Sequence, residues 1–485
     1  MLFRSADRVG IDAATIRRIA AELSAAPTAA VYGRIGTTCQ EFGTLSSMML
    51  DLVNLLTGNL DSVGGVMFST GAAGQPSTKG EPGKGRGFRI GGSVSRVSGT
   101  RSSLGEFPVT VMPEEIETPG EGQIRAMVTV SGNPASSNPN SGRVNAAFEQ
   151  LDFMVSVDPY INETTRHADV ILPPPTALQK SHFDLAFVNL SVRNVANYSE
   201  QVFPLEDGQM DEGEILRRLT AIFVGEAASG PEADAATEAI DDAVASAMAS
   251  SAVRDDFGNV AGRDASELLD AVSELRGSER LLDISLRTGP YGGGIEGDGL
   301  SLAQLKEHPH GVDLGALEEH RIPALLRTKS GTIELLNDDL RSEFERLAAT
   351  VDEEVPEMVL VGRRHVRSNN SWMHNVKVLT KGRNRCTLQI HPDDADRLGI
   401  ADGDAAKVSS RVGELVIDCE RTDVVRPGVV SIPHGFGQNT EGVKLRVASE
   451  YRGVNTNLLT DEYLRDPISG NIALNGVPVT VSAAT

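Results

Sequence analysis

The chain of 485 residues is poor in cysteine: it holds only Cys39, Cys386 and Cys419, which stand far apart and include no C-x-x-C pair. An iron–sulfur cluster usually takes four cysteine ligands, so this chain by itself should hold none. A disulfide framework is equally unsupported, and isolated cysteines fit a reducing compartment. The N-terminal residues contain no apolar core of a signal peptide. We therefore expect a cytoplasmic protein.

Basic residues and long apolar runs are also scarce. Lysine and arginine number 45 against 67 aspartates and glutamates, which gives a net charge of −22. Because nucleic acids are bound through clustered cations, no nucleic-acid partner is expected. No apolar run approaches the ~20 residues that cross a bilayer, so no membrane span is expected either. The signature motifs of P-loop proteins, zinc proteases and α/β-hydrolases are missing.

What the chain does contain is a series of short apolar runs that end abruptly in polar, glycine or proline residues. Three of them lie close together: Ala126–Val130, Phe153–Val157 and Val170–Leu172. Apolar residues at helical spacing fill the segment between the first two, which predicts parallel strands joined by crossovers. In such sheets ligands bind beyond the carboxyl ends of the strands. Small or polar residues stand at those ends: Gly132, Asn133, Asp158 and Asn162.

These strand-end residues suit a nucleotide, and the Asp158 carboxylate could accept hydrogen bonds from a guanine edge. A second unit of the same kind is expected near the N-terminus. There, Asp12 is expected to cap a helix, Ala29–Tyr32 to form a strand, and a second helix to run from about Thr44 to Gly58. The turn between strand and helix, with Gly36 and Gln40, could present backbone N–H groups to an anion.

From Pro356 onward, short alternating runs separated by turns predict a β-barrel-like domain. The expected strands are MVLVG, VKVLT, CTLQI, AAKVSS, ELVIDCE and GVVSIP, with a small helix at Pro392–Leu398. We therefore predict an α/β protein in which Rossmann-like parallel-sheet domains precede a C-terminal β-barrel. Residues 69–122, rich in Gly, Ser, Pro, Lys and Arg, are either a flexible linker or a long loop that closes over an anionic ligand.

One stretch concentrates positive charge in an otherwise acidic protein. GRRHVRSNNSWMHN holds Arg363, Arg364, Arg367, His365 and His374. A bound phosphate or pyrophosphate would explain it, because charge-assisted hydrogen bonds are each worth ~1.5–3 kcal/mol. A basic surface turn paired with the acidic excess is the alternative. Further polar loop residues join this constellation: Asn369, Asn370, Ser371, His434, Asn455 and Asn457. Structural or surface roles are expected for His167, His182, His308 and His310.

Several motifs in the same order carry a family resemblance: GRIGTTCQEFG, VSGNPASSNP, VDPYINETTRHADVILPPPT, LVGRRHVRSNNSWMHN, IPHGFG and GVNTNLLTD. With them the chain resembles the molybdopterin-dependent oxidoreductases of the dimethyl sulfoxide reductase superfamily, in particular formate dehydrogenase-like and thiosulfate reductase-like members. The resemblance covers nearly the whole chain and is weak over residues 225–350.

The resemblance implies a molybdenum bis(molybdopterin guanine dinucleotide) cofactor held between α/β domains and a double-psi-like barrel. It places Gln40 at a pterin, and Gly132, Asn133, Asp158 and Asn162 at one guanosine end. Barrel residues would cover the pterins: Arg363, Arg364, His365, Asn370, Ser371, His434 and Asn455. The implied domains are 1–68 (end of an α/β cofactor domain), 69–122 (Gly/Arg-rich loop), 123–350 (α/β dinucleotide-binding domain with an acidic helical insertion at 225–280) and 351–485 (dinucleotide-binding barrel).

Two expected features of the family are missing from the sequence. Neither the four-cysteine motif for a 4Fe-4S cluster nor the segment with the molybdenum ligand is found, and both are expected upstream of Met1. We therefore expect the C-terminal portion of such an enzyme, inactive alone, with no metal ligand and no catalytic residue identified here. A small-molecule substrate and an electron-transfer partner or complementary N-terminal chain are implied. A non-catalytic pterin dinucleotide carrier and a plain mononucleotide-binding protein are the alternatives.

Overall fold

A computed structural model describes residues 2–73, 81, 83–84, 90–226, 230–451 and 453–484. The chain divides into two compact units, each assembled from three stretches that are separate in the sequence. Unit 1 consists of residues 1–31, 53–87 and 174–335, and unit 2 of residues 32–52, 88–173 and 336–485. All the predicted cofactor-binding residues fall in unit 2, so that unit positions the candidate site.

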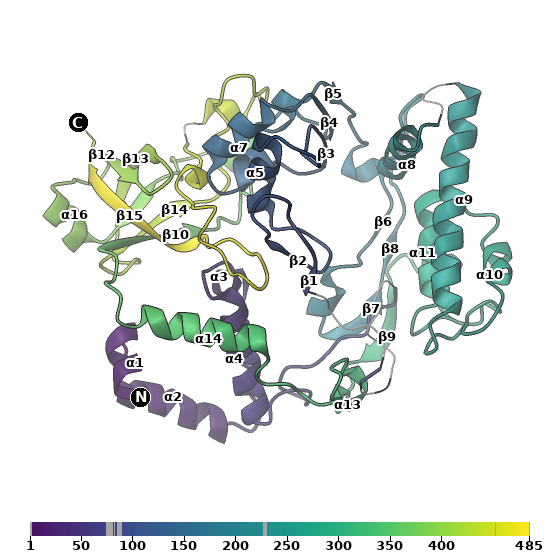
Figure 1. The fold of residues 1–485 in the computed structure, drawn as a ribbon, viewed down its shortest axis with the longest axis horizontal. Coiled ribbons are helices and arrows are strands. Elements are labelled where there is room, and N and C mark those ends of the chain that lie inside the picture. Colours follow the sequence, from purple (N-terminus) through teal and green to yellow (C-terminus); the bar gives the residue numbers. More distant parts are fainter. Residues whose placement is uncertain are drawn as a thin grey trace. The chain divides into compact units, whose positions relative to one another are not determined.

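The C-terminal part of unit 2 is a closed barrel of six strands in the order β10-β14-β11-β13-β12-β15. Figure 1 labels these strands except β11. The strands are β10 (Met358–Arg363), β11 (Leu388–Ile390), β12 (Ala405–Ser409), β13 (Glu414–Arg421), β14 (Val429–Pro433) and β15 (Asn475–Ala483). Strands β10 and β14 pair in parallel, as do β11 and β13, and the other pairs are antiparallel. This confirms the predicted barrel.

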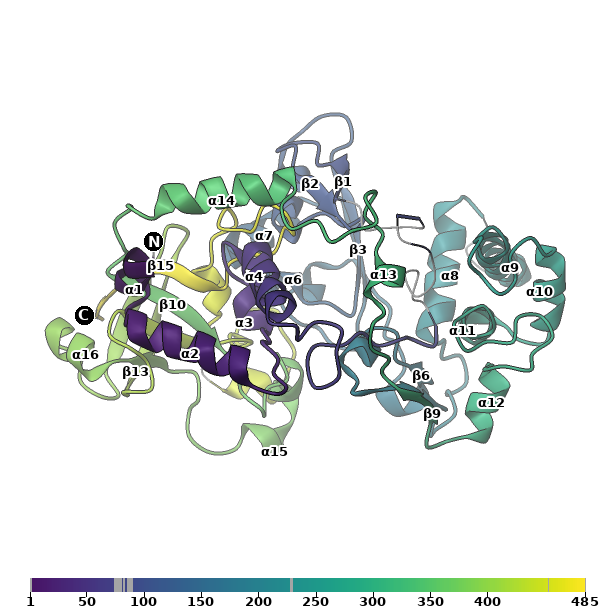
Figure 2. The same ribbon diagram turned by 90° about the horizontal axis from the view of Figure 1, so that it is seen from below.

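Period-two alternation explains why these segments form a barrel with a filled interior. In β13, Leu415, Ile417 and Cys419 are buried while the residues between them are exposed. Strand β15, which the sequence reading did not anticipate, alternates in the same way and closes the barrel between β10 and β12. Helix α16 (Pro392–Leu398) lies against the barrel and has the predicted bounds (Figures 1 and 2).

A three-stranded parallel sheet forms the α/β part of unit 2. Its strands are β3 (Ala126–Val130), β4 (Phe153–Val157) and β5 (Val170–Ile171). Helix α7 (Ser141–Phe148) makes the crossover from β3 to β4 and buries Val144, Ala147 and Phe148. The predicted parallel strands and crossover are thus confirmed. The remaining elements of this part are β1 (Ile90–Val94), β2 (Arg101–Ser103), α5 (Met112–Glu117) and α6 (Pro134–Ser137).

Strands β1 and β2 and helix α5 lie within residues 69–122. For this stretch the sequence allowed two interpretations, a flexible linker or a long loop that closes over an anionic ligand. The hairpin β1–β2 and helix α5 show that the stretch is partly regular. Residues 74–80, 82 and 85–89 lie outside the described residues.

Two further helices border the candidate site in unit 2. Helix α3 (Ile35–Thr38) is a single turn, and α14 (Asp338–Thr350) begins at Asn337, whose side chain caps it. Helix α4 (Gly43–Leu56) starts in unit 2 and ends in unit 1. Gly43 permits a close approach there, because a Cβ at this position would come within 2.1 Å of the Thr38 carbonyl oxygen.

Helices are the main regular elements of unit 1. The helices α8 (Glu212–Phe223), α9 (Pro231–Val253), α10 (Ala265–Ala271) and α11 (Gly277–Arg287) pack side by side, as Figures 1 and 2 show. Small residues of α9, Ala245 and Ala249, are fully buried against Leu268 and Ile284. Other elements are α1 (Leu2–Val9), α2 (Ala13–Ala25), α12 (Leu302–Glu307), α13 (Ile322–Leu325), β6 (His182–Phe183), β7 (Arg193–Ala196), β8 (Tyr198–Ser199) and β9 (Val312–Ala316).

Two predicted strands are wrong. Ala29–Tyr32 forms no strand, because the side-chain amide of Asn54 takes both hydrogen bonds of Val31 that a neighbouring strand would otherwise supply. VKVLT contains a helical turn, α15 (Lys377–Thr380), in which Val378 is 64% exposed. The predicted cap of α2 is confirmed, since Asp12 accepts from the Thr15 amide at 2.8 Å.

Candidate functional site

The loops that follow β3 and β4 share a network of polar side chains, all of them buried except Asn133, which is partly exposed. We call its members the strand-end cluster: Asn133, Asp158, Asn162, Glu163 and Thr164. Asn133 donates to Glu163 Oε2 at 2.6 Å and accepts from Thr164 Oγ1 at 2.7 Å. Thr164 Oγ1 in turn accepts from the Ala135 amide at the start of α6. The network therefore joins the loop after β3 to the loop after β4, as expected for neighbouring parallel strands.

Asp158 and Asn162 fix the turn directly after β4. The Asp158 carboxylate accepts from the Tyr160 amide at 2.8 Å and from Asn162 Nδ2 at 3.2 Å. Asn162 Oδ1 accepts from the amides of Thr164 and Thr165. Burial raises the pKa of the Asp158 carboxyl above its ordinary value. Since each carboxylate oxygen has a further lone pair, Asp158 keeps acceptor capacity for a ligand.

Two polar atoms of these loops are buried without a hydrogen-bond partner among the described residues. They are Glu163 Oε1, an acceptor, and Asn138 Nδ2, a donor. Glu163 is 4% exposed and Asn138 is 7% exposed. A buried polar group left unpaired costs ~1–3 kcal/mol, so each of these two atoms requires a partner, which a ligand or an ordered water can supply.

Arg363, the last residue of β10, and Arg364, the first residue of the loop after it, make different contacts. Arg363 donates to the carbonyl oxygens of Ser431 and Thr387 at 2.7 and 2.9 Å and to that of Arg385 at 3.1 Å. Burial lowers its pKa. Its guanidinium therefore holds the barrel together, whereas Arg364 is exposed and bonds to the Asn370 side chain. His365 Nδ1 accepts from the amide of Arg367, and desolvation and Arg385 lower its pKa.

The same loop turns back on itself at Asn369 and Asn370. Both have left-handed backbones, with φ of 41° and 63°, a conformation that asparagine tolerates better than most residues. Gly435 packs closely against this turn. Its φ is 90°, and a Cβ added at this position would come within 2.3 Å of the Asn370 carbonyl oxygen. The neighbouring His434 is half-buried, and desolvation together with Arg364 lowers its pKa to about 4. Its ring is therefore neutral at pH 7.

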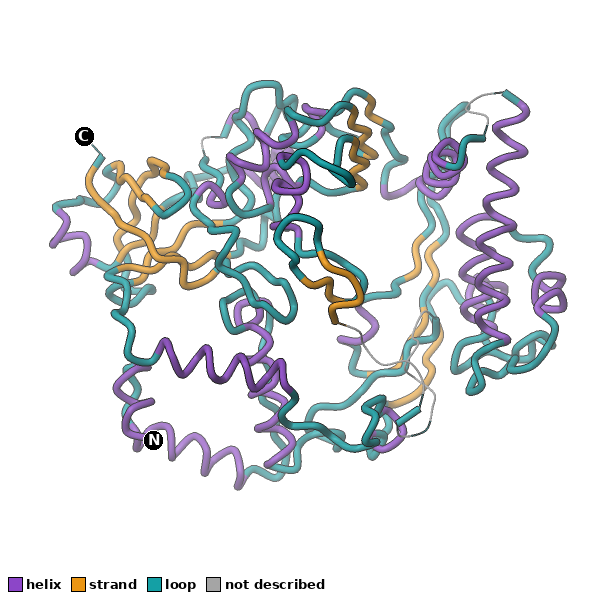
Figure 3. The backbone as a smooth tube through the Cα atoms, viewed as in Figure 1, coloured by secondary structure: helices purple, strands orange, loops and turns teal. Residues whose placement is uncertain are grey.

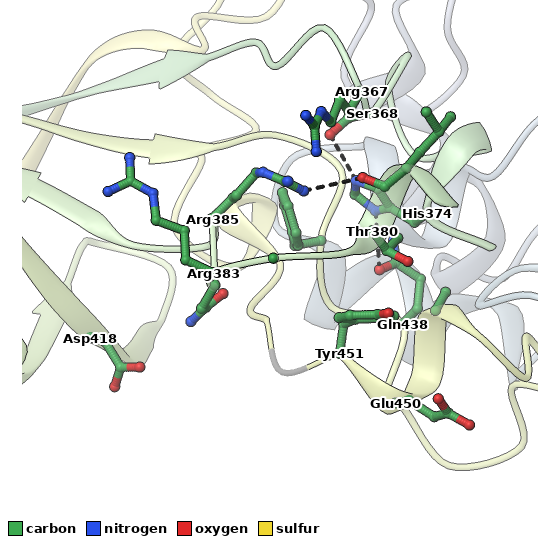
Figure 4. Close-up of a pocket in the computed structure, with 15 residues that line it drawn as sticks. Arg367, Ser368, His374, Thr380, Arg383, Arg385, Asp418, Gln438, Glu450 and Tyr451 are labelled. Carbon is green, nitrogen blue, oxygen red and sulfur yellow. Dashed lines mark hydrogen bonds between the residues drawn. The ribbon is translucent and has the colours of Figure 1, made fainter. Parts of the chain in front are cut away.

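A pocket of about 300 Å³ opens beside this loop (Figure 4). Three arginines line it, Arg367, Arg383 and Arg385, against two acids, Asp418 and Glu450. The balance of charge in the lining therefore favours an anionic ligand.

Inside the pocket wall, a buried histidine is held on both ring nitrogens. Figure 4 shows Ser368 bonded to His374, whose Nε2 is 2.9 Å from the hydroxyl. His374 Nδ1 faces Gln438 Oε1 at 3.4 Å, and burial lowers its pKa. This neutral histidine holds the loop in place, so the positive charge of the pocket lining comes from its arginines.

The turn with Gly36 and Gln40 packs on the start of β15. The amides of Leu474 and Asn475 donate to the Cys39 carbonyl oxygen at 3.0 and 3.2 Å. Asn475 Nδ2 also donates to the Gly36 carbonyl oxygen at 3.5 Å, and its Oδ1 accepts from Gly362 next to Arg363. Asn475 thus ties the Gln40 turn to the loop after β10.

Residues 434–474, which join β14 to β15, contact both the strand-end loops and the loop after β10. This connection is mostly loop (Figure 3). The Lys444 amide donates to the Ile161 carbonyl oxygen at 2.9 Å, and Asn455 Nδ2 donates to Ser141 Oγ at 3.2 Å. One segment therefore contacts the strand-end loops and, through Gly435, the loop after β10.

Some residues named from the sequence stand apart from this arrangement. His182 and His308 lie in unit 1. His167 lies in unit 2, where its Nε2 is 3.0 Å from Asn145 Oδ1 and burial lowers its pKa. Within the described residues, no group of three His, Cys, Asp or Glu side chains could hold a metal ion. Among the same residues, no helix has the length and apolar character needed to span a membrane.

Sequence reasoning missed Glu163 and Asn475. Glu163 lies inside the motif VDPYINETTRHADV, and its signal was a carboxylate in an expected strand-end loop. Asn475 gave no signal, because the strand that it begins was not anticipated.

Two protein-family models match this chain. Residues 10–221 match the molybdopterin oxidoreductase family and residues 358–478 match the molydopterin dinucleotide binding domain. The alpha subunit of a formate dehydrogenase from Methanocaldococcus jannaschii is 25% identical over 343 residues, 70% of this chain and 42% of that protein. The arsenate respiratory reductase molybdopterin-containing subunit of Chrysiogenes arsenatis is 37% identical over 123 residues, 23% of this chain and 14% of that protein.

Among solved structures, acetylene hydratase from Pelobacter acetylenicus has a similar fold. The TM-score is 0.67 at 15% identity, and the match covers 100% of this chain and 64% of that one. The chain thus spans less than two thirds of the length of the relatives described here. The two matched domains, their order and the shared fold confirm the resemblance read from the motifs: the chain belongs to the molybdopterin oxidoreductase family.

Proposed function

We propose that unit 2 binds molybdopterin guanine dinucleotide, with the strand-end cluster at a guanine base and the loop after β10 at the pterin and phosphates. The observation that carries the proposal is the connection 434–474, which joins the two sets of residues by direct hydrogen bonds. In this assignment Asp158 accepts from the base, Arg364 pairs with a phosphate, and Gln40 contacts a pterin.

The residues present fit such a group. A guanine edge carries N–H donors and a carbonyl acceptor, and the strand-end loops hold a buried acceptor and a buried donor without partners, Glu163 Oε1 and Asn138 Nδ2. The arginines at the pocket offer the charge that a diphosphate requires. When bound, the molybdenum centre of the cofactor supplies the redox chemistry.

We further propose that the cofactor is the bis form and that this chain supplies the second half of a formate dehydrogenase-like site. The support is the match to a formate dehydrogenase subunit, of which the chain spans 42%. The molybdenum ligand, the 4Fe-4S cluster and the contact with an electron acceptor would then come from polypeptide beyond this sequence. On this proposal the chain alone binds cofactor and turns over no formate.

The full chain can be tested directly with metal-free molybdopterin guanine dinucleotide and with GDP. We expect the dinucleotide to bind more tightly than GDP, because both ends of the site are then used. Equal binding of GDP would indicate a plain mononucleotide-binding protein, and no binding of either ligand would refute the proposal. Dye-linked formate oxidation after addition of the N-terminal half of a relative tests the catalytic part, and binding without oxidation would indicate a cofactor carrier.

A further inference from the structure

Helix α14 lies outside both family matches, between residues 221 and 358, yet it holds the turn that carries Gln40. The contact is made by Arg346, in the third turn of the helix. Arg346 Nη1 is 2.6 Å from Glu41 Oε1, and Nη2 donates to the Glu41 carbonyl oxygen at 2.9 Å. The guanidinium carbon also stands 3.8 Å from the centre of the Phe42 ring.

Arg346 is itself held in place from its own helix. Glu343, 5% exposed, accepts from Arg346 Nε at 3.1 Å and from Nη2 at 2.8 Å. An exposed ion pair between flexible side chains would contribute little, typically ~0–1 kcal/mol. Here the guanidinium is oriented beforehand, contacts a backbone carbonyl and stacks on an aromatic ring, so a larger effect is expected.

The residues that flank this turn, Cys39 and Thr44, are bound by the start of β15 and by Asp466 of the connection before it. Thr44 donates from its amide and its hydroxyl to Asp466, at 2.9 and 2.7 Å, and Asp466 is fully buried. The Cys39 carbonyl oxygen accepts from β15, as described above. Between these fixed points, the Gly43 amide donates to the Gln40 carbonyl oxygen at 3.1 Å. Arg346 therefore binds the two residues that follow Gln40, while Cys39 and Thr44, on either side of them in the sequence, are bound by residues 466–475.

We propose that Arg346 is a positioning residue for the cofactor: it holds the 40–43 turn in the conformation in which Gln40 meets the pterin. The inference rests on the function proposed above. It assigns to α14, a helix outside both matched domains, a role in how long the pterin stays bound. Arg346 touches Glu41 and Phe42 and acts on the ligand only through Gln40.

The test compares Arg346→Ala with two controls in the full chain. Arg341→Ala removes an exposed arginine of the same helix, and Arg101→Ala removes an ion pair between β2 and Asp339 of α14 without touching the turn. Hydrogen exchange at the Cys39 and Gly43 amides reports the turn without any ligand. Dissociation of metal-free molybdopterin guanine dinucleotide reports the positioning.

For Arg346→Ala we expect exchange at Gly43 to be roughly tenfold faster and dissociation of the dinucleotide to be roughly tenfold faster, with both controls like the wild type. Arg346→Lys keeps the charge near Glu41 and is expected to fall between Arg346→Ala and the wild type in both measurements. If the alanine variant does not fold, the same two measurements on Arg346→Lys test the inference.

Three results would overturn the inference. Unchanged exchange at Gly43 would show that Arg346 does not hold the turn. Faster exchange with unchanged dissociation would leave Arg346 a purely structural residue and the proposed function intact. A wild-type chain that binds no dinucleotide would refute the proposed function and the inference with it, whatever the exchange rates.

Discussion

At the carboxyl ends of β3 and β4 the candidate site is buried, acidic and hydrogen-bonded to itself, whereas the loop after β10 is exposed, basic and partly open. Asp158, Asn162 and Glu163 are each less than 10% exposed, while Arg364 is exposed. The two regions belong to the same unit and are joined by one connection. The difference between them matches two different recognition tasks.

Recognition of a base edge depends on the direction of a few hydrogen bonds, which a rigid and buried network supplies. Recognition of phosphate depends mainly on positive charge, which the guanidinium groups of exposed arginines supply together with paired N–H donors. The comparison therefore predicts base selectivity at the strand-end cluster and salt sensitivity at the loop after β10. The following changes test that division, from the largest expected effect to the smallest.

Replacing Asp158 with Asn should have the largest effect on base selectivity. The variant keeps an acceptor for the Tyr160 amide but carries an NH2 group in place of the second oxygen, which removes the acceptor for Asn162 Nδ2 and presents N–H groups to the ligand. We expect affinity for the guanine dinucleotide to fall roughly 100-fold, with little change for the adenine analogue. Isothermal titration with both ligands measures this. Asp152→Asn, an exposed acid paired with Arg125, is the matched control, and an equal loss for both bases would contradict base readout by Asp158.

Replacing His434 with Gln should remove a pH dependence of stability. Its pKa is about 4 in the folded chain against an ordinary 6.5, so the unfolded state binds more protons between these values. Stability from this group is complete above pH 6.5 and is lost as the pH falls toward 4. We expect the wild type to lose roughly 2 kcal/mol more than the variant between pH 7 and pH 4, since the ring is only half-buried. Urea unfolding at both pH values measures this, and parallel losses would show that the ring is not shielded.

Replacing Arg364 with Ala should weaken the phosphate end alone. We expect roughly tenfold weaker binding of the guanine and adenine dinucleotides alike, together with a flatter dependence of affinity on salt. Arg426→Ala, which removes an exposed arginine before β14, should leave both unchanged. A loss confined to the guanine ligand would place Arg364 at the base and reverse the assignment of the two regions.

Replacing Glu163 with Gln should give the smallest effect, with opposite signs for stability and binding. In the absence of ligand, a neutral amide is less costly to bury than a carboxylate group whose Oε1 has no partner. We expect the free energy of unfolding to rise by about 1 kcal/mol and the affinity for the guanine dinucleotide to fall. Urea unfolding and titration are the measurements. A variant that is less stable than the wild type would show that the buried Oε1 atom of Glu163 does not destabilise the ligand-free protein.

Much of the candidate site could be predicted from the sequence because strand ends and charge clusters are local features. The runs Ala126–Val130 and Phe153–Val157 became β3 and β4 as predicted, and their polar followers form one network. The strand predicted at Ala29–Tyr32 is wrong because the side chain of Asn54 takes the backbone hydrogen bonds of Val31 that a neighbouring strand would otherwise make. VKVLT failed because the alternating valines of that run have no sheet to cover and stay exposed.

The sequence by itself identified the segments of the candidate site, since the apolar spacing, the strand-end polar residues and the basic cluster are all short-range patterns. Only the tertiary structure decided which of these polar side chains remain free to bind a ligand. It committed Arg363 to barrel carbonyls and left Arg364 exposed, and it brought Arg346 to Glu41 across 305 positions. The physical reason is that hydrogen-bond donors are assigned by packing, which depends on contacts between residues that no local pattern connects.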